Sequence, residues 1–350
     1  DVTTNQATYV QLLNKQQELN IMKASAQGNV RIVDHAFVPE LPVAPRKTLI
    51  TLLSALVAGA LASVWCLFRE NTRQGITSSD EIEALDLEVS ALVPYSKIQQ
   101  KRDTLKRTLT SSNGRSSYLL ANENATDTAV EAIRALRTNI YFSMLDAKNN
   151  VLMITGAAPE AGKSFISSNL ATVMAQSGKK VLLIDADMRK GYLEQLFSTH
   201  VAPGLSELLS GEASPVEAVQ QTDIENLFFI SHGNYTQSSS ELLMNKRLGD
   251  LIEQASKRYD YVIIDTPPVL AVTDAAIVGQ HVGMTLMVAR YGYTTAQDLD
   301  NAARRLVQSN INIKGVILNG IKRDAFNSYN CYSYGSYTAG SDKKAAKSKG

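Results

Sequence analysis

The chain has 350 residues, of which 44% are hydrophobic, and its formal net charge at neutral pH is +1. This length and composition suit one or two folded domains with a full core, so general disorder is not expected. The near-neutral charge argues against a nucleic-acid-binding protein, whose binding surface carries an excess of basic residues. The two cysteines, Cys66 and Cys331, give no basis for a disulfide framework or a cysteine-rich metal site, and suit a reducing compartment.

The N-terminal segment, residues 1–47, is polar and ends in a proline-containing stretch. Tyr9–Gln27 has a helical composition, and three prolines follow between positions 39 and 45. Spaced prolines favour extended backbone, so this part is interpreted as the end of an extracytoplasmic domain with a stiff connector. Because the chain begins at Asp1 with neither a methionine nor a leader, we expect it to be the C-terminal part of a longer protein.

The next segment, residues 48–68, contains no charged residue. At ~1.5 Å per residue it is long enough to cross a hydrocarbon core of ~30 Å, and it predicts a transmembrane helix. Ala55, Gly59 and Ser63 place small side chains on one helix face, where a second helix can approach closely. The alternative is that small residues are simply common in such helices.

Residues 69–125 are expected to form a juxtamembrane linker, with a short acidic helix at Asp80–Val89. From residue 126 to 322, apolar runs alternate with helical segments. The runs are 151–155, 181–184, 227–230, 261–264, 283–289 and 315–318. This alternation predicts an α/β domain of the P-loop NTPase type, with a mostly parallel sheet covered by helices on both faces. The tail, residues 323–350, is rich in tyrosine, serine and lysine and is expected to be disordered.

A phosphate-binding loop is predicted where the run 151–155 leads through Gly162-Lys163-Ser164 into a helix. Backbone N–H groups at a helix N-terminus bind anions, Lys163 would neutralise phosphate charge, and the Ser164 hydroxyl would ligate Mg²⁺. The predicted nucleotide-binding residues of the loop are Ala157, Ala158, Pro159, Glu160, Ala161, Gly162, Lys163, Ser164 and Phe165. Ala157 stands where the usual first glycine would be, which leaves a chance Gly-Lys-Ser as the alternative.

Three aspartates follow two other predicted strands. Asp185 and Asp187 end the run 181–184, and Asp265 ends the run 261–264. Because ligands of such sheets collect at the carboxyl edge of the strands, these carboxylates are predicted to lie beside the phosphate loop. Together with Ser164 they form the predicted Mg²⁺ site, and together with Lys163 the predicted catalytic set. The alternative for the first pair is a solvated Asp-x-Asp turn.

With these motifs, the chain resembles the bacterial tyrosine kinases (BY-kinases) attached to polysaccharide co-polymerases of the chain-length-determinant family, including their second transmembrane helix. Ala158 stands where the related MinD- and ParA-like ATPases carry a signature lysine, and Asp185–Tyr192 matches the Walker A′ motif of the kinases. The motif Glu131, Arg134 and Arg137 matches the ExxRxxR sequence through which these kinase domains form a ring. The alternative is an ordinary salt-bridged surface helix.

The resemblance implies transfer of the γ-phosphoryl group of ATP, with Mg²⁺ as cofactor, to tyrosines. The implied phosphoacceptors are Tyr192, Tyr329, Tyr332, Tyr334 and Tyr337. Asn319 matches a position that contacts adenine in related ATPases. His232 stands where this branch often has an arginine able to bind phosphotyrosine, which puts the Tyr192 switch in doubt; otherwise a histidine at a strand end is usually a polar surface residue.

The resemblance also implies the location and partners of the chain. The kinase domain must face the cytoplasm, where ATP is, so the chain is expected in the bacterial inner membrane with its N-terminal segment in the periplasm. The implied partners are further copies in a homo-oligomeric ring, the membrane, a tyrosine phosphatase and polysaccharide polymerase or export proteins. Two alternatives remain open: an ATPase switch of the MinD/ParA type, and a co-polymerase scaffold whose kinase module only binds nucleotide.

Overall fold

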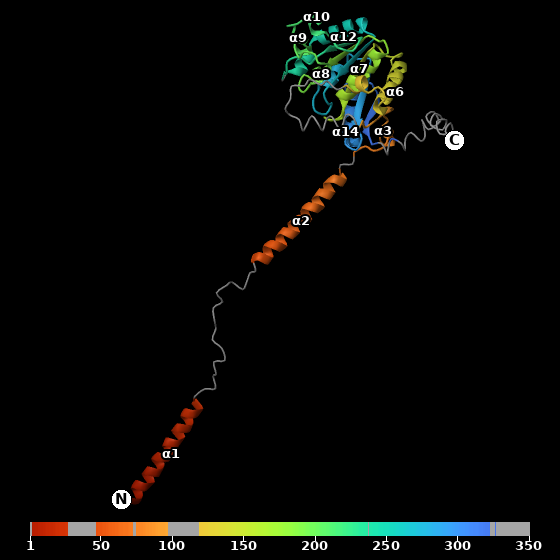
Figure 1. The fold of residues 1–350 in the computed structure, drawn as a ribbon. Coiled ribbons are helices and arrows are strands. Elements are labelled where there is room, and N and C mark those ends of the chain that lie inside the picture. Colours follow the sequence, from red (N-terminus) through yellow and green to blue (C-terminus); the bar gives the residue numbers. More distant parts are fainter. Residues whose placement is uncertain are drawn as a thin grey trace, which may run out of the picture. The chain divides into compact units, whose positions relative to one another are not determined.

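The structure, a computed structural model, describes residues 2–26, 47–72, 75–96, 119–236, 238–322 and 326 (Figure 1). The chain forms two units, Asp1–Phe68 and Arg69–Gly350, and each is described by itself. The helices are α1 (Val2–Ala26), α2 (Lys47–Thr72), α3 (Asp80–Glu83), α5 (Leu120–Glu123), α6 (Thr128–Ser143), α7 (Lys163–Gln176), α8 (Leu193–Phe197), α9 (Leu205–Ser210), α10 (Pro215–Ala218), α11 (Ser239–Leu243), α12 (Lys246–Arg258), α13 (Asp274–Gly279) and α14 (Ala296–Gln308). The strands are β1 (Val89–Pro94), β2 (Val151–Gly156), β3 (Val181–Asp185), β4 (Gln220–Gln221), β5 (Leu227–Ile230), β6 (Tyr261–Asp265), β7 (Met284–Arg290) and β8 (Ile313–Ile321).

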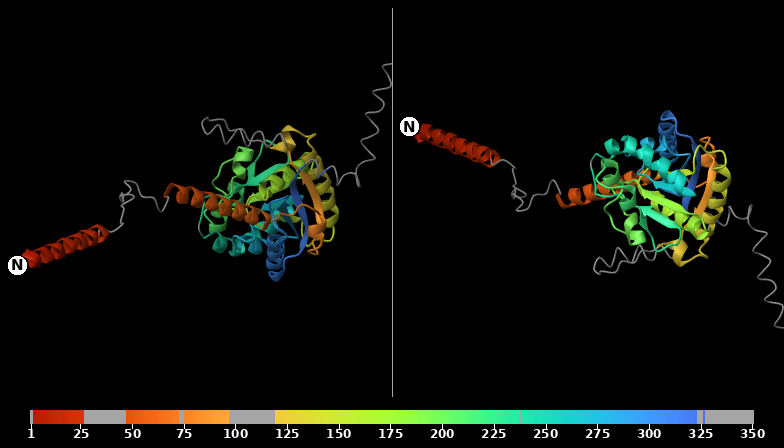
Figure 2. Two further views of the ribbon diagram at one scale, coloured as in Figure 1. Left: turned by 90° about the horizontal axis from the view of Figure 1, so that it is seen from below. Right: turned by 90° about the horizontal axis from the view of Figure 1, so that it is seen from above.

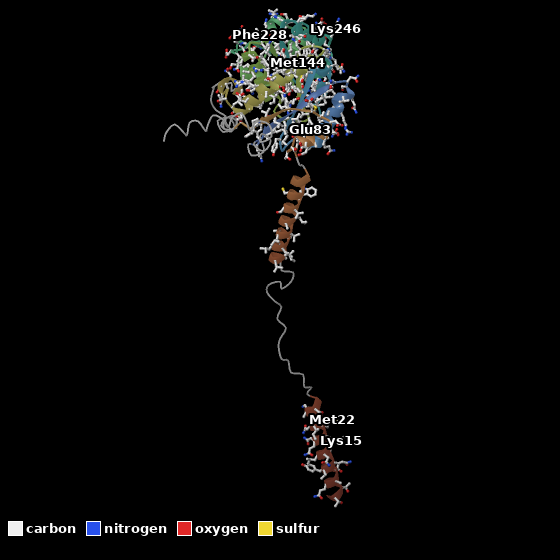
Figure 3. All side chains as sticks on the ribbon, turned by 90° about the vertical axis from the view of Figure 1, so that its right-hand side faces the viewer. Lys15, Met22, Glu83, Met144, Phe228 and Lys246 are labelled. Atoms are coloured by element: carbon white, nitrogen blue, oxygen red, sulfur yellow. The ribbon has the colours of Figure 1, made fainter. Side chains whose placement is uncertain are left out.

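The first unit consists of helices whose described side chains are exposed. Along α1 the side chains project outward without packing partners in the described part of the chain, as Figure 3 shows for Lys15 and Met22. Helix α2 is long and apolar enough to cross a membrane, with a mean hydropathy of 2.1 over Leu49–Cys66. The Ser63 hydroxyl donates to the carbonyl of Gly59 at 2.8 Å, so this polar group is satisfied within the helix.

The second unit is built on one sheet with the strand order β1-β8-β7-β2-β6-β3-β5-β4. Neighbouring strands pair in parallel, except that the short β4 pairs antiparallel with β5. All six apolar runs of the sequence form strands, and the predicted mostly parallel α/β sheet is confirmed. The order puts β6 between β2 and β3, so the ends of the strands that carry the predicted site are adjacent.

Helices cover both faces of this sheet (Figure 2). Successive side chains of a strand point to opposite faces. Val151 and Met153 therefore pack into the core formed with α12, α13 and α14, whereas Leu152 and Ile154 pack into the core formed with α6 and α7. Burial on both faces explains why the central strands are continuous apolar runs rather than alternating ones.

The folded unit begins earlier than expected. Strand β1 and helix α5 belong to it, although both lie within the linker predicted for residues 69–125, so that part of the prediction is wrong. Strand β1 pairs with β8 along the edge of the sheet, with Leu92 opposite Leu318. Helix α5 packs on α7, where the backbone N–H of Ala121 donates to Asn169 Oδ1 at 2.8 Å. An edge strand is half-buried, and so its six residues lack the continuous apolar run that identified the central strands. The expected acidic helix is also shorter, covering only α3.

The segment that follows α2 is joined to the loop between β7 and α14. The N–H of Ile76 donates to the carbonyl of Thr294, and the N–H of Gly292 donates to the carbonyl of Ile76, both at 2.8 Å. Gly75 is required here because a Cβ atom would lie 2.3 Å from the backbone of Gly292. This contact ties residues 75 and 76 to a loop at the carboxyl edge of the sheet.

Candidate nucleotide-binding and catalytic site

The phosphate loop joins β2 to α7 at the carboxyl edge of the sheet. Gly162 caps α7 with a positive φ of 91°. A Cβ atom on Gly162 would lie 2.0 Å from Asn319 Nδ2, so both the backbone conformation and the space require glycine. Ala157 and Ala161 are buried, while Pro159 and Glu160 are exposed and Ala158 and Phe165 are half-buried. The N-terminus of α7 therefore opens toward the loop, where its free N–H groups can bind an anion.

Lys163 begins α7 and is only 8% exposed. Burial lowers the pKa of its ammonium group, and the negative charges of Asp265 and Asp187 oppose that effect. A buried ammonium group lacks the water that would stabilise it. It is consequently suited to a phosphate group, which would restore a favourable charge partner.

Ser164 and Asp265 form the central contact of the site. The Ser164 hydroxyl donates to Asp265 Oδ2 at 2.6 Å. The other carboxylate oxygen, Oδ1, is buried without a hydrogen-bond partner among the described residues. Burial raises the pKa of Asp265 to about 6, and the Ser164 hydrogen bond opposes this. A serine hydroxyl beside a carboxylate oxygen without a hydrogen-bond partner is a suitable pair of ligands for Mg²⁺. This ion binds one or two carboxylates and fills its other coordination positions with water and phosphate oxygens.

Asp185 and Asp187 lie at the end of β3, and their environments differ. Asp185 is opposite Asp265 in the parallel register of β3 and β6. It is fully buried, and burial followed by the charge of Asp265 raises its pKa well above the usual range. Asp187 is half-exposed and accepts a hydrogen bond from the N–H of Lys190 at 2.9 Å. Among the described residues, no three carboxylates, histidines or cysteines are arranged to hold a metal by themselves.

Two residues from the ends of other strands hold the phosphate loop. Asn319, on β8, donates its amide to the carbonyl of Ala161 at 3.1 Å. Arg290, which ends β7, donates to the carbonyl of Glu160 at 3.2 Å, and Glu160 itself has a positive φ of 61°. The expected adenine contact of Asn319 stays a prediction. Arg290 was missed, although its position at the end of a strand on the same edge could have indicated it.

Near Tyr192, the structure corrects the interpretation of His232. His232 is not a polar surface residue: it is 1% exposed, and its Nε2 lies 3.6 Å from Glu194 Oε2. It lies two residues after β5, and its ring stacks on that of Tyr235. Tyr192 is exposed, as an acceptor would need to be. The tail acceptors Tyr329, Tyr332, Tyr334 and Tyr337 lie outside the described residues.

The predicted oligomerisation motif lies on the outer face of α6. Arg134 contacts Glu131 and also donates to the carbonyl of Ala125 at 2.9 Å. Arg137 is half-buried and lines a shallow cavity of about 210 Å³ between α6 and α7, with Tyr141 among its neighbours. The opposite face of α6 is the apolar one that packs on the sheet. Formation of a ring through this motif stays a prediction.

Comparison with known proteins identifies the family. Residues 1–71 match the domain family described as "G-rich domain on putative tyrosine kinase", and residues 151–314 match the family described as "AAA domain". A "Putative tyrosine-protein kinase in cps region" from Klebsiella pneumoniae is 46% identical over 98% of the chain and 48% of its own length. The chain spans about half the length of the curated relatives it matches.

Two solved kinase domains match most of the chain. The kinase domain of the Escherichia coli tyrosine kinase ETK is 44% identical, with a TM-score of 0.66 over 71% of this chain and 96% of that domain. The BceF tyrosine kinase domain is 46% identical, with a TM-score of 0.66 over 71% of this chain and all of that domain. The chain therefore belongs to the bacterial tyrosine kinase family.

Proposed function

We propose that this chain is the membrane-anchored, ATP-dependent kinase part of a protein that phosphorylates tyrosines, including its own. The observation that carries this proposal is the cluster at one sheet edge: Lys163 buried at the start of α7, and Ser164 2.6 Å from Asp265. The loop after β2 leads to Lys163 and Ser164 at the start of α7, and β6 ends at Asp265. These groups thus lie at the carboxyl edge, where such sheets bind nucleotides.

The residues divide the chemistry between them. The α7 N-terminus and Lys163 bind the phosphates and stabilise the charge of the transferring phosphoryl group. Ser164 and Asp265 would hold Mg²⁺, which would neutralise phosphate charge when bound. Asp187 is half-exposed, unlike the buried Asp185, and this exposure supports assigning it the role of accepting the proton of an incoming tyrosine hydroxyl. Asp185 supports it by accepting the N–H of Asp187 at 3.1 Å.

The acceptors proposed for this reaction are Tyr192 and the tail tyrosines between positions 329 and 337. Four tyrosines in a polar tail have no core to fill. Each phosphate would add roughly −1.5 to −2 charges at neutral pH. This charge would weaken a ring of chains held together by basic and acidic patches, such as the α6 face that carries Glu131, Arg134 and Arg137.

The location and partners follow from the same proposal. Helix α2 would anchor the chain in the bacterial inner membrane, with the kinase unit in the cytoplasm and α1 on the periplasmic side, because ATP is cytoplasmic. The Klebsiella pneumoniae relative is described as a kinase in a cps region, which supports a role in capsule or exopolysaccharide polymerisation and export. The proposed partners are other copies of the chain, the membrane, a tyrosine phosphatase and polysaccharide polymerase or export proteins.

One experiment tests the proposed activity. The purified chain in detergent is incubated with Mg·ATP, and phosphotyrosine at each site is quantified together with free phosphate. We expect tail phosphotyrosine in the wild type and in Lys257→Met, whose lysine lies on the surface, but not in Lys163→Met. Release of phosphate without phosphotyrosine would refute the kinase and favour an ATPase switch.

A further inference from the structure

Tyr235 lies in the segment after β5 and is hydrogen-bonded to the loop between β3 and α8. This loop, residues 186–192, carries Asp187 and is called the carboxylate loop below. The Tyr235 hydroxyl donates to the carbonyl of Gly191 at 2.9 Å. The N–H of Gly191 in turn donates to the carbonyl of Asp187 at 2.7 Å. The hydroxyl is thus hydrogen-bonded to Gly191, and Gly191 is hydrogen-bonded to the proposed proton acceptor, Asp187.

The ring of Tyr235 also covers a buried polar pair. It stacks on His232 with 4.6 Å between the ring centroids and 18° between the planes. Beneath it, both nitrogens of His232 and Oε2 of Glu194 are buried with no hydrogen-bond partner in the described part of the chain. Tyr235 itself is 63% exposed. Its hydroxyl therefore faces the site, and its ring remains reachable from solvent.

We propose that Tyr235 is a phosphoacceptor of this kinase, and that its phosphorylation releases the segment 231–236 from the carboxylate loop. The proposal rests on the proposed kinase function and adds a residue that neither the Walker motifs nor the tyrosine-rich tail includes. It assigns the Tyr235 hydroxyl two alternative roles, as a hydrogen-bond donor when unmodified and as a phosphate ester when modified.

The transfer needs no component beyond the proposed activity. The Tyr235 oxygen attacks the γ-phosphorus of ATP, and the new O–P bond forms while the bond from that phosphorus to the β,γ-bridging oxygen breaks. ADP leaves with the electron pair of the broken bond. Asp187 accepts the phenolic proton. Partial burial, together with the charges of Glu194, Asp185 and Asp187, raises the pKa of Tyr235, so the phenol is protonated at neutral pH and requires such a base.

Phosphorylation would break the contact for two physical reasons. A phosphate ester has no proton to donate to the Gly191 carbonyl, and its roughly −1.5 to −2 charges would be repelled by that carbonyl and by Glu194. Opening would also let water reach His232 and Glu194, whose buried polar atoms oppose the closed arrangement. Phosphorylation is therefore expected to move the segment 231–236 away from the loop that carries Asp187, which would give an incoming tyrosine access to that carboxylate.

The test maps phosphate on one peptide. Trypsin leaves Tyr192 and Tyr235 in the same fragment, but cleavage after glutamate yields the peptide 226–241, in which Tyr235 is the single tyrosine. The full chain in detergent is incubated with Mg·ATP as the wild type, Tyr235→Phe and Lys163→Met. The phenylalanine variant keeps the stacking ring and removes only the hydroxyl, and its thermal unfolding verifies that it folds.

We expect phosphate on this peptide in the wild type and in neither variant. Amide hydrogen exchange in residues 231–236 should become roughly fivefold faster in unmodified Tyr235→Phe than in unmodified wild type, which is the effect of losing one hydrogen bond, and faster still after phosphorylation. Phosphotyrosine in the tail with none on this peptide would overturn the proposal while leaving the kinase intact. Absence of phosphotyrosine from every site would overturn both.

Discussion

Removing the negative charge of Asp265 should stabilise the nucleotide-free protein. Asp265 is 2% exposed, and burial moves the pKa of its carboxyl from 3.8 to about 6. One pKa unit corresponds to about 1.36 kcal/mol, so ionisation of this group opposes folding by about 3 kcal/mol at pH 8. Because the folded-state pKa is raised, stability is lost as the pH rises from about 4 to about 6. The Asp265→Asn side chain cannot ionise, yet its amide oxygen can still accept the Ser164 hydroxyl.

The assay is thermal unfolding of Asp265→Asn and wild type, without nucleotide and with a chelator, at pH 5 and pH 8. At pH 8 the variant should gain about 3 kcal/mol, or roughly 6–12 °C in Tm for a domain of this size. At pH 5 the wild-type carboxyl is largely protonated, and the gain should fall to about half. Mg·ATP should reverse the order, because it stabilises only the chain that can bind it.

A surface control separates this effect from a general effect of lost charge. Asp300 forms an ion pair with Arg304 on the outside of α14, with 2.9 Å between Oδ2 and Nη2. Asp300→Asn should change stability by less than about 0.5 kcal/mol at either pH. A lower Tm for Asp265→Asn at pH 8, or the same gain at both pH values, would refute the argument from the buried charge.

Three further changes test how the site and the domain are held. Gly162→Ala should weaken binding of a fluorescent ATP analogue at least tenfold, because its Cβ would clash with Asn319; Gly178→Ala, with a similar positive φ of 83° but open space, should leave binding unchanged. Arg290→Gln should raise the KM for ATP several-fold while stability stays within about 1 kcal/mol, because it removes one hydrogen bond to the phosphate loop; an unchanged KM would contradict that role. Asn169→Leu leaves the α5 backbone N–H unpaired and should lower stability by about 1–3 kcal/mol, with faster proteolysis near residue 120; equal cleavage rates would mean that α5 does not depend on this contact.

The residues proposed for the nucleotide site could be located from the sequence because they combine local signals. An apolar run followed by Gly-Lys-Ser and a helical segment specifies a strand, a loop and a helix within a few residues. Asp185 and Asp265 each end an apolar run. Parallel strands have their carboxyl ends at one edge, so the placement of these residues follows from the alternation of strands and helices.

Other features could not be predicted, because they depend on contacts between distant segments. Strand β1 is recognisable only beside β8, because an edge strand buries one side and has no continuous apolar run. His232 has the sequence pattern of a polar surface residue, and only the stacking of Tyr235 on its ring shows that it is buried.

The sequence by itself determined the α/β class, the apolar helix and the candidate phosphate-loop and carboxylate residues, since each rests on a pattern within one short segment. Only the tertiary structure decided that Arg290 and Asn319 hold the phosphate loop and where the folded unit begins. It also decided that Asp185 and Asp265 share a buried site whose burial raises their pKa values. Burial and pairing depend on the strand order, and the strand order comes from packing of the whole sheet rather than from any one segment.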